Sequence, residues 1–140
     1  MKTIICLISS ILISSTTLAD QKFLYKGQCF AVDGKNITKP CLVSESGSAE
    51  RYQTTFILPD ASYYVLQEKI TAPDGEDLTY SLGEKSDELL EAEIYPRDFK
   101  TKKVSEDYKN DAWSCIKQVK GKLDICQNTV HASSTEAFPS

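Results

Sequence analysis

The fold is decided by residues 113–126, which read WSCIKQVKGKLDIC. Folding this stretch about Lys120-Gly121 as a two-residue turn creates three matched cross-strand pairs: Cys115 with Cys126, Ile116 with Ile125, and Lys117 with Asp124. Glycine tolerates the positive φ that such a turn requires, and β-branched or oppositely charged residues are favourable cross-strand partners. Directly opposed residues also lie close enough for a disulfide. The stretch therefore predicts a hairpin closed by Cys115–Cys126.

A second pair of cysteines, Cys29 and Cys41, flanks a similar turn. The two are symmetric about Lys35, and the bend between them reads Asp33-Gly34-Lys35-Asn36. Asp, Gly and Asn favour turns because they tolerate left-handed φ or hydrogen-bond locally. We therefore expect Cys29 to face Cys41 in a second hairpin, with Phe30 and Val32 on the opposite face of the strand. Four cysteines allow three connectivities, and chain distance favours Cys29–Cys41 with Cys115–Cys126.

The N-terminal segment indicates where these disulfides form. It reads MKTIICLISSILISSTTLAD, with Lys2 before an apolar run and small residues before Ala19. This is the layout of a secretory signal peptide, and the apolar run is too short to span a bilayer. We predict a signal peptide over 1–19 that contains Cys6, so the mature chain keeps four cysteines. A four-cysteine zinc site is the rival interpretation, but it needs closely spaced cysteine pairs. Disulfides in a periplasmic or secreted protein are the expectation.

Composition restricts the function. The chain has 140 residues, with 16 Lys and Arg against 20 Asp and Glu, for a formal net charge of −4. A nucleic-acid partner is not expected, because such proteins carry a basic surplus. The single histidine, His131, falls in a small, polar segment, 128–140, that we predict to be a flexible tail. With the four cysteines expected in disulfides and the one histidine in the tail, we predict a single domain over 20–127 that is not an enzyme and carries no metal or cofactor.

Between the hairpins, short β-like runs alternate with turn signals. The runs cover 52–58, 62–70, 78–82 and 91–95, where Pro96 ends the last, and Ala72-Pro73-Asp74-Gly75-Glu76 is the strongest turn between them. This spacing predicts an all-β fold, either a small antiparallel β-sandwich or a barrel. Residues 84–93 are the one candidate for a short helix, and residues 96–111 are expected to form a long surface loop.

Aromatic residues supply the candidate contact site. Tyrosine is frequent at protein interfaces because it buries area while keeping a polar end. Tyr63 and Tyr64 are neighbours, so on a strand they face opposite sides. The segment Tyr95-Pro96-Arg97-Asp98-Phe99 places two aromatic residues and an arginine close together. We therefore predict partner binding by Tyr63, Tyr64, Tyr95, Arg97 and Phe99, although tyrosines that merely cover a sheet face are the alternative.

Two resemblances bear on function. One depends on five short motifs and a final cysteine: Gly27-x-Cys29, Asp33-Gly34-Lys35, Pro40-Cys41-x-Val43, Leu58-Pro59-Asp60, Trp113-x-Cys115 and Cys126. With these the chain resembles small exported bacterial proteins that have the same two cysteine pairs and no established function. The stretch Ser46-Gly47-Ser48-Ala49-Glu50-Arg51-Tyr52 looks like the Ser-Gly motif of periplasmic c-type lysozyme inhibitors, with an insertion. Those inhibitors are small disulfide-bearing β-barrels, so this resemblance implies a barrel that binds an enzyme.

Taken together, these observations predict an exported periplasmic binding protein with a protein partner and no membrane span. An inhibitor or immunity protein against a cell-wall hydrolase or an envelope-targeted toxin is the leading hypothesis. An acidic inhibitor would be steered electrostatically toward a basic enzyme or toxin. A structural or accessory envelope protein is the second hypothesis, and a small hydrolase is a weaker third. The sequence leaves the oligomeric state open.

Overall fold

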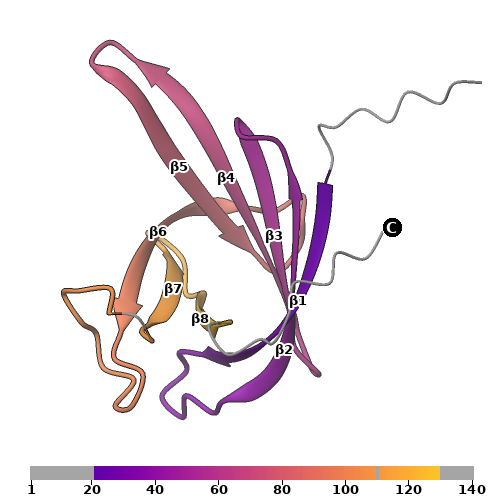
Figure 1. Ribbon diagram of the computed structural model, residues 1–140, viewed down its shortest axis with the longest axis vertical. Helices are drawn as coiled ribbons and strands as arrows, with labels where there is room; N and C mark the ends of the chain where they lie inside the picture. The colour runs from indigo at the N-terminus through magenta and orange to yellow at the C-terminus, as the bar shows by residue number, and fades with distance from the viewer. Residues whose placement is uncertain (1–20, 110, 130–140) are drawn as a thin grey trace, which may run out of the picture.

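The structure is a computed structural model that describes residues 21–109 and 111–129. It is an all-β protein in which eight antiparallel strands form a closed ring, each strand pairing with the next in the chain and the last with the first (Figure 1). The strands are β1 (Gln21–Ala31), β2 (Lys39–Gly47), β3 (Arg51–Ile57), β4 (Ser62–Ala72), β5 (Gly75–Gly83), β6 (Leu90–Arg97), β7 (Trp113–Gln118) and β8 (Asp124–Asn128). The predicted all-β class is confirmed, and of the two predicted architectures the barrel is the one found.

The hairpin of β7 and β8 has the predicted register. Cys115 pairs with Cys126, Ile116 with Ile125 and Lys117 with Asp124, and the Cys115–Cys126 disulfide joins the two strands. The reason for glycine at the turn was predicted wrongly, because positive φ is found at Gly34, Gly47 and Gly75 but not at Gly121. A Cβ at Gly121 would lie 1.9 Å from Oε1 of Gln118, so glycine leaves room for that side chain. There Oε1 of the buried Gln118 accepts from the Leu123 N–H at 3.2 Å, while Nε2 of the same side chain donates to Leu82 O at 2.7 Å.

The first hairpin keeps its predicted disulfide but not its predicted register. Cys29 and Cys41 are bonded, yet Cys29 pairs with Lys39 and Cys41 with Gly27. The ladder between β1 and β2 ends at Cys29 and Lys39, so the register is shifted from the predicted one and a wide loop joins the two strands. On its other edge, β1 pairs with β8 over Gln28–Ala31, which closes the ring. Within that loop, the Asp33 carboxylate accepts hydrogen bonds from the backbone N–H groups of Lys35 and Asn36, both at 3.0 Å.

Burial occurs on both faces of the strands where the ring closes. The barrel interior holds one cluster of buried side chains: Cys29, Cys41, Val43, Phe56, Leu58, Leu82, Ala92, Ile116 and Ile125. A second cluster lies on the outer face of β1, β7 and β8, and consists of Phe30, Trp113, Cys115 and Cys126 with Val32, Tyr95 and Phe99 packed against them. The predicted opposite faces of Cys29 and Phe30 are therefore confirmed. Ile37, in the loop between β1 and β2, is exposed.

The middle of the chain follows most of the predicted runs. The runs at 52–58, 62–70 and 78–82 become β3, β4 and β5, and Gly75 in the turn between β4 and β5 has a φ of 132°. The helix considered for 84–93 is wrong, because Leu90 onward belongs to β6, where alternate residues face the interior. Pro96 does not end that strand: it pairs with Ser114 on β7, and β6 continues to Arg97.

The predicted ends of the chain lie largely outside the described residues. The signal peptide over 1–19 is among them, as is His131 with the rest of 130–140. Asn128, which the sequence assigned to the tail, is buried in β8 and donates to Asp111 O at 2.9 Å. No helix in the described part of the chain is long and apolar enough to cross a membrane.

Candidate functional site

The five predicted contact residues fall into two groups. Tyr95, Arg97 and Phe99 come together beside the second cluster, on β6 and the segment that follows it. Tyr63 and Tyr64 are on β4, and Tyr63 packs against the interior cluster. Tyr64 lies over a small hollow of about 100 Å³ on the other face of β4, which Gln53, Thr55, Leu66 and Leu89 also line. The opposite orientation of the two tyrosines is confirmed, but the structure does not gather the five into one surface.

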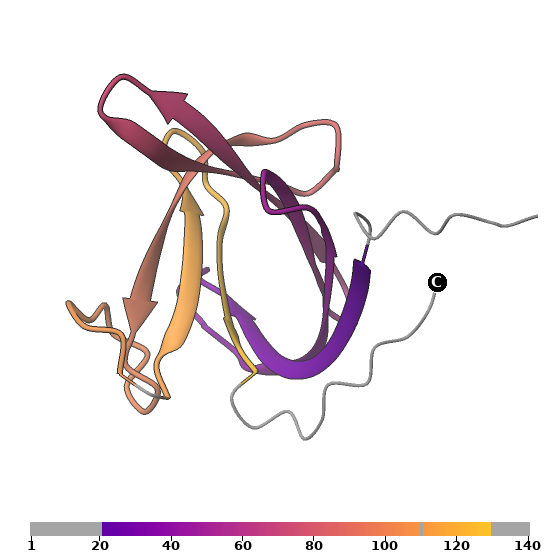
Figure 2. The ribbon, with the colours of Figure 1, turned by 45° about the horizontal axis from the view of Figure 1, so that its top comes forward.

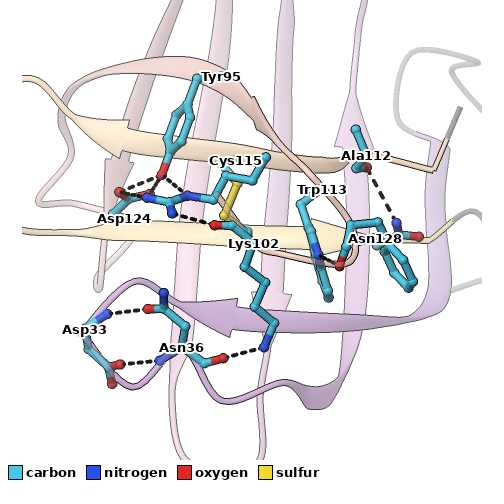
Figure 3. Close-up of a disulfide and its surroundings, with 12 residues drawn as sticks. Asp33, Asn36, Tyr95, Lys102, Ala112, Trp113, Cys115, Asp124 and Asn128 are labelled. Carbon is cyan, nitrogen blue, oxygen red and sulfur yellow. Dashed lines mark hydrogen bonds and ion pairs between the residues drawn. A yellow bond between two sulfur atoms is a disulfide. The ribbon is translucent and has the colours of Figure 1, made fainter. Parts of the chain in front are cut away.

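Tyr95 and Arg97 both interact with Asp124, which the sequence analysis had matched by charge with Lys117 across the hairpin. The Tyr95 hydroxyl lies 2.6 and 2.7 Å from the two carboxylate oxygens of Asp124 and donates to that carboxylate (Figure 3). Arg97 Nε donates to the same hydroxyl oxygen at 3.0 Å, and Nη1 donates to Lys102 O at 2.7 Å. Asp124 thus interacts with Tyr95 and Arg97, whereas Lys117, its predicted charge partner across the hairpin, forms an ion pair with Glu93 at 3.2 Å.

Burial governs the protonation of this group. Desolvation, followed by the hydrogen bond to Asp124, raises the pKa of Tyr95 to about 12, while Arg97 opposes the rise. Desolvation likewise raises the pKa of the Asp124 carboxyl above its ordinary value, although Tyr95, Arg97 and Lys117 all favour its charged form. The Arg97 and Asp124 side chains are only 13% and 16% exposed. Their polar groups are therefore largely used within the molecule and offer little to a partner.

The segment after β6 covers the second cluster. Trp113 Nε1 donates to Phe99 O at 3.0 Å, and the two rings stack with centroids 5.5 Å apart (Figure 3). Phe30 meets Trp113 edge-on at 4.7 Å, and the Lys102 ammonium lies 4.8 Å from the centre of the Phe30 ring while donating to Asn36 O. The expected surface loop is thus a packed cover for the Cys115–Cys126 disulfide. Tyr95 and Phe99 pack against the second cluster, and partner binding by Tyr95, Arg97 and Phe99 stays a prediction.

A further group of aromatic side chains lies on the barrel-facing side of the first three strands. Tyr52 donates to a carboxylate oxygen of Glu45 at 2.6 Å, and burial together with that hydrogen bond raises the pKa of Tyr52. Tyr25 stacks beside Phe23 with ring centroids 6.3 Å apart, and burial and the Glu45 charge raise its pKa too. The Tyr52 hydroxyl and the rings of Phe23 and Tyr25 thus have partners within the molecule, so we interpret this group as part of the fold.

The most exposed element is one that the sequence did not single out. From Glu68, the last residue of β4 that pairs with β3, to Thr79, the last residue of β5 before its pairing with β6 begins, the two strands form a two-stranded ribbon, residues 68–79, which we call the arm. Figures 1 and 2 show the arm projecting away from the barrel. Ile70 and Leu78, on its two faces, are each 44% exposed. Single exposed apolar residues are common on protein surfaces, but these two lie on a ribbon that projects from the barrel, so the arm is the candidate contact surface.

The charge of the arm is uniform in sign. It carries four carboxylates, Glu68, Asp74, Glu76 and Asp77, against a single lysine, Lys69. Lys69 is already paired with Glu76 at 2.7 Å. The acidic character continues along the chain, since residues 74–93 contain eight carboxylates and one lysine. The sequence did contain one indication of the arm. The predicted strand at 62–70 is longer than its neighbour at 52–58, and an acidic turn follows it.

The described residues offer little for metal or thiol chemistry. Nowhere in 21–109 or 111–129 do three His, Cys, Asp or Glu side chains gather as ligands for a metal ion. Cys29, Cys41, Cys115 and Cys126 are all in disulfides.

Comparisons with known proteins give no family. No family model, no curated protein and no solved structure matches the chain. The stretch that resembles the lysozyme-inhibitor motif, 46–52, forms the end of β2, an exposed turn and the start of β3.

Proposed function

We propose that the protein is an exported binding protein that inhibits or neutralises a basic cell-wall hydrolase or an envelope-targeted toxin, and that the arm makes the contact. The observation that carries the proposal is the arm itself, which exposes Ile70 and Leu78 among four carboxylates. Apolar residues surrounded by charge of one sign are typical of a surface that a partner of opposite charge covers. The acidic arm therefore favours a basic partner.

The rest of the molecule supports this role. A protruding element binds tightly only when its support is rigid, because ordering a mobile segment costs binding free energy. Here β4 is anchored by its pairing with β3, and the barrel is fastened by two disulfides. Disulfides also favour an oxidising compartment such as the periplasm or the exterior.

The test compares the mature protein with an arm variant, Ile70→Asp combined with Leu78→Asp. Each protein is immobilised and incubated with periplasmic extract, and any enzyme that is captured is then assayed for lytic activity with and without the soluble protein. We expect the unchanged protein to capture a basic enzyme in stoichiometric amount and to inhibit it, and the arm variant to do neither. Equal capture and inhibition by both proteins would remove the arm from the proposal.

The second candidate function is a structural or accessory role in the envelope. The packed cover over the Cys115–Cys126 disulfide favours it, since it stabilises the fold without creating a contact site. The same experiment separates the two. A folded protein that captures no enzyme and inhibits none would favour the accessory role.

A further inference from the structure

The barrel opens between β5 and β6. These two strands share only three residue pairs, from Tyr80 with Ala92 to Leu82 with Leu90, and then diverge (Figure 1). Within the described residues, β4 is the only strand that pairs with β5 over Gly75–Thr79, so the other edge of β5 is unpaired there. The arm therefore has a free strand edge that faces the opening.

The hydrogen-bonding direction along the arm can be derived from one contact. The Lys69 N–H donates to Glu50 O at 2.9 Å, so the backbone groups of Lys69 point toward β3. In an antiparallel ladder the opposite residue, Leu78, then turns its N–H and C=O away from β4, toward the opening. Because backbone direction alternates along a strand, Glu76 turns its groups the same way. The free edge thus presents the backbone donors and acceptors of Glu76 and Leu78.

One of these donors is already occupied by a local group. The Leu78 N–H donates to the carboxylate of Asp77 at 2.9 Å. This contact shows that the N–H points outward, and it protects an edge that would otherwise pair with other chains. Edge strands are commonly protected by charged side chains in this way, and the carboxylates here repel a second acidic copy of the edge.

Side chains on both sides of the opening add an apolar surface. Leu78 shares its face with Tyr80 and Leu82, which pack into or against the interior cluster. Ile94 lies across the opening on β6, on the face of its pairing partner Ile116, and is 46% exposed. On the opposite face lie the carboxylates of Asp77, Glu91 and Glu93. The opening is therefore apolar on one face and acidic on the other.

We propose that the free edge of β5 binds an extended segment of a basic protein by strand addition, with residues that alternate between apolar and cationic. The apolar residues of that segment would lie beside Leu78 and Ile94, and its lysines or arginines beside Asp77 and Glu91. Main-chain hydrogen bonds provide the affinity in this mode, and alternate side chains provide the specificity. This inference deepens the proposed function, since it specifies how the arm recognises its partner.

The test uses a short, labelled, acetylated peptide of alternating lysine and valine, with affinity measured by fluorescence anisotropy. Leu78→Pro removes the outward N–H but no bond to β4, so we expect it to weaken binding at least about fivefold, the loss of roughly one hydrogen bond. Thr71→Pro is the matched control, because Thr71 turns its N–H toward the other edge of the same arm. It should bind the peptide like the unchanged protein. Leu78→Ala keeps the N–H and should weaken binding less than Leu78→Pro.

A peptide with N-methylated valines completes the design, since it keeps the charge and loses backbone donors. We expect it not to bind. If it binds as well as the parent peptide, or if Leu78→Pro and Thr71→Pro behave alike, the peptide is held by charge alone and the inference is wrong. The two proposals can fail separately: an enzyme inhibited equally by the protein and by Leu78→Pro would leave the proposed function standing without strand addition. Peptide binding by the free edge without inhibition of any enzyme would support strand addition and contradict the proposed function.

Discussion

The region around Trp113 and the arm differ in whether their polar and apolar side chains have partners within the molecule. Around Trp113, polar side chains are bound internally: Tyr95 and Arg97 to Asp124, and Lys102 to Asn36 O. On the arm, Ile70 and Leu78 remain half exposed and carboxylates of like charge lie close together. Satisfied contacts stabilise a fold, whereas exposed apolar groups cost solubility unless something covers them. The comparison places the stabilising contacts on the Trp113 side and leaves the arm as the proposed recognition surface.

The largest effect on stability is expected at Trp113. Replacing a buried aromatic residue of this size by alanine costs about 3–5 kcal/mol, and Trp113→Ala also removes the hydrogen bond to Phe99 O. Urea denaturation of the variant would measure the loss. Trp113→Phe keeps a ring against Phe30 and should lose distinctly less. A Trp113→Ala protein with the unfolding midpoint of the parent would mean that the cover does not stabilise the barrel.

A smaller, pH-dependent effect is expected at Tyr95. Its pKa is raised from the ordinary tyrosine value of 10.0 to about 12 in the fold, so the folded state holds this proton more tightly than the unfolded chain. The resulting stabilisation is complete below pH 10 and is lost as the pH rises toward 12. We expect Tyr95→Phe to reduce, but not abolish, the alkaline loss of stability, because burial raises the pKa of Tyr25, Tyr52 and Tyr63 as well.

The measurement is a series of urea midpoints between neutral and strongly alkaline pH, for the parent and for Tyr95→Phe. At neutral pH the variant should be less stable by about 1–3 kcal/mol, because the buried Asp124 carboxylate loses its donor. Parallel pH profiles for the two proteins would contradict the role assigned to the Tyr95 proton.

The smallest effect on stability, and the largest on recognition, is expected on the arm. Ile70→Ser combined with Leu78→Ser changes side chains that are only half buried, so the free energy of unfolding should change by roughly 0.5 kcal/mol per site or less. Binding of the alternating lysine–valine peptide should nevertheless fall. Calorimetric melting and anisotropy on the same samples would test both. A large fall in melting temperature would show that the arm belongs to the stabilising half.

The sequence predicted the local pairings because they depend on neighbouring residues. Lys120-Gly121 and its flanking pairs specify the β7–β8 register, and Pro73-Asp74-Gly75 specifies the β4–β5 turn, without reference to any other strand. The Cys115–Cys126 disulfide follows for the same reason, and Cys29–Cys41 follows from the short stretch of chain between its cysteines. The β1–β2 register was predicted wrongly, because Asp33 and the residues after it form a loop with its own hydrogen bonds and not a tight turn between the strands.

The candidate site shows the same division. The residues Tyr95, Arg97 and Phe99 were recognisable as a group, but whether they face a partner depends on Asp124 and Trp113, which are distant in the sequence. The arm and the opening beside it depend on where β3 and β6 stop pairing, which is set by how the ring closes.

By itself, the sequence determined the all-β class, both disulfides, most strands and the acidic charge, because alternation, turn chemistry and composition are local or additive properties. The tertiary structure alone decided that the sheet closes into a ring, that the loop after β6 covers Trp113, and that β5 keeps a free edge beside Leu78. These features depend on pairing between strands that are distant in the sequence. That pairing is determined by which side chains are buried once the whole barrel has formed.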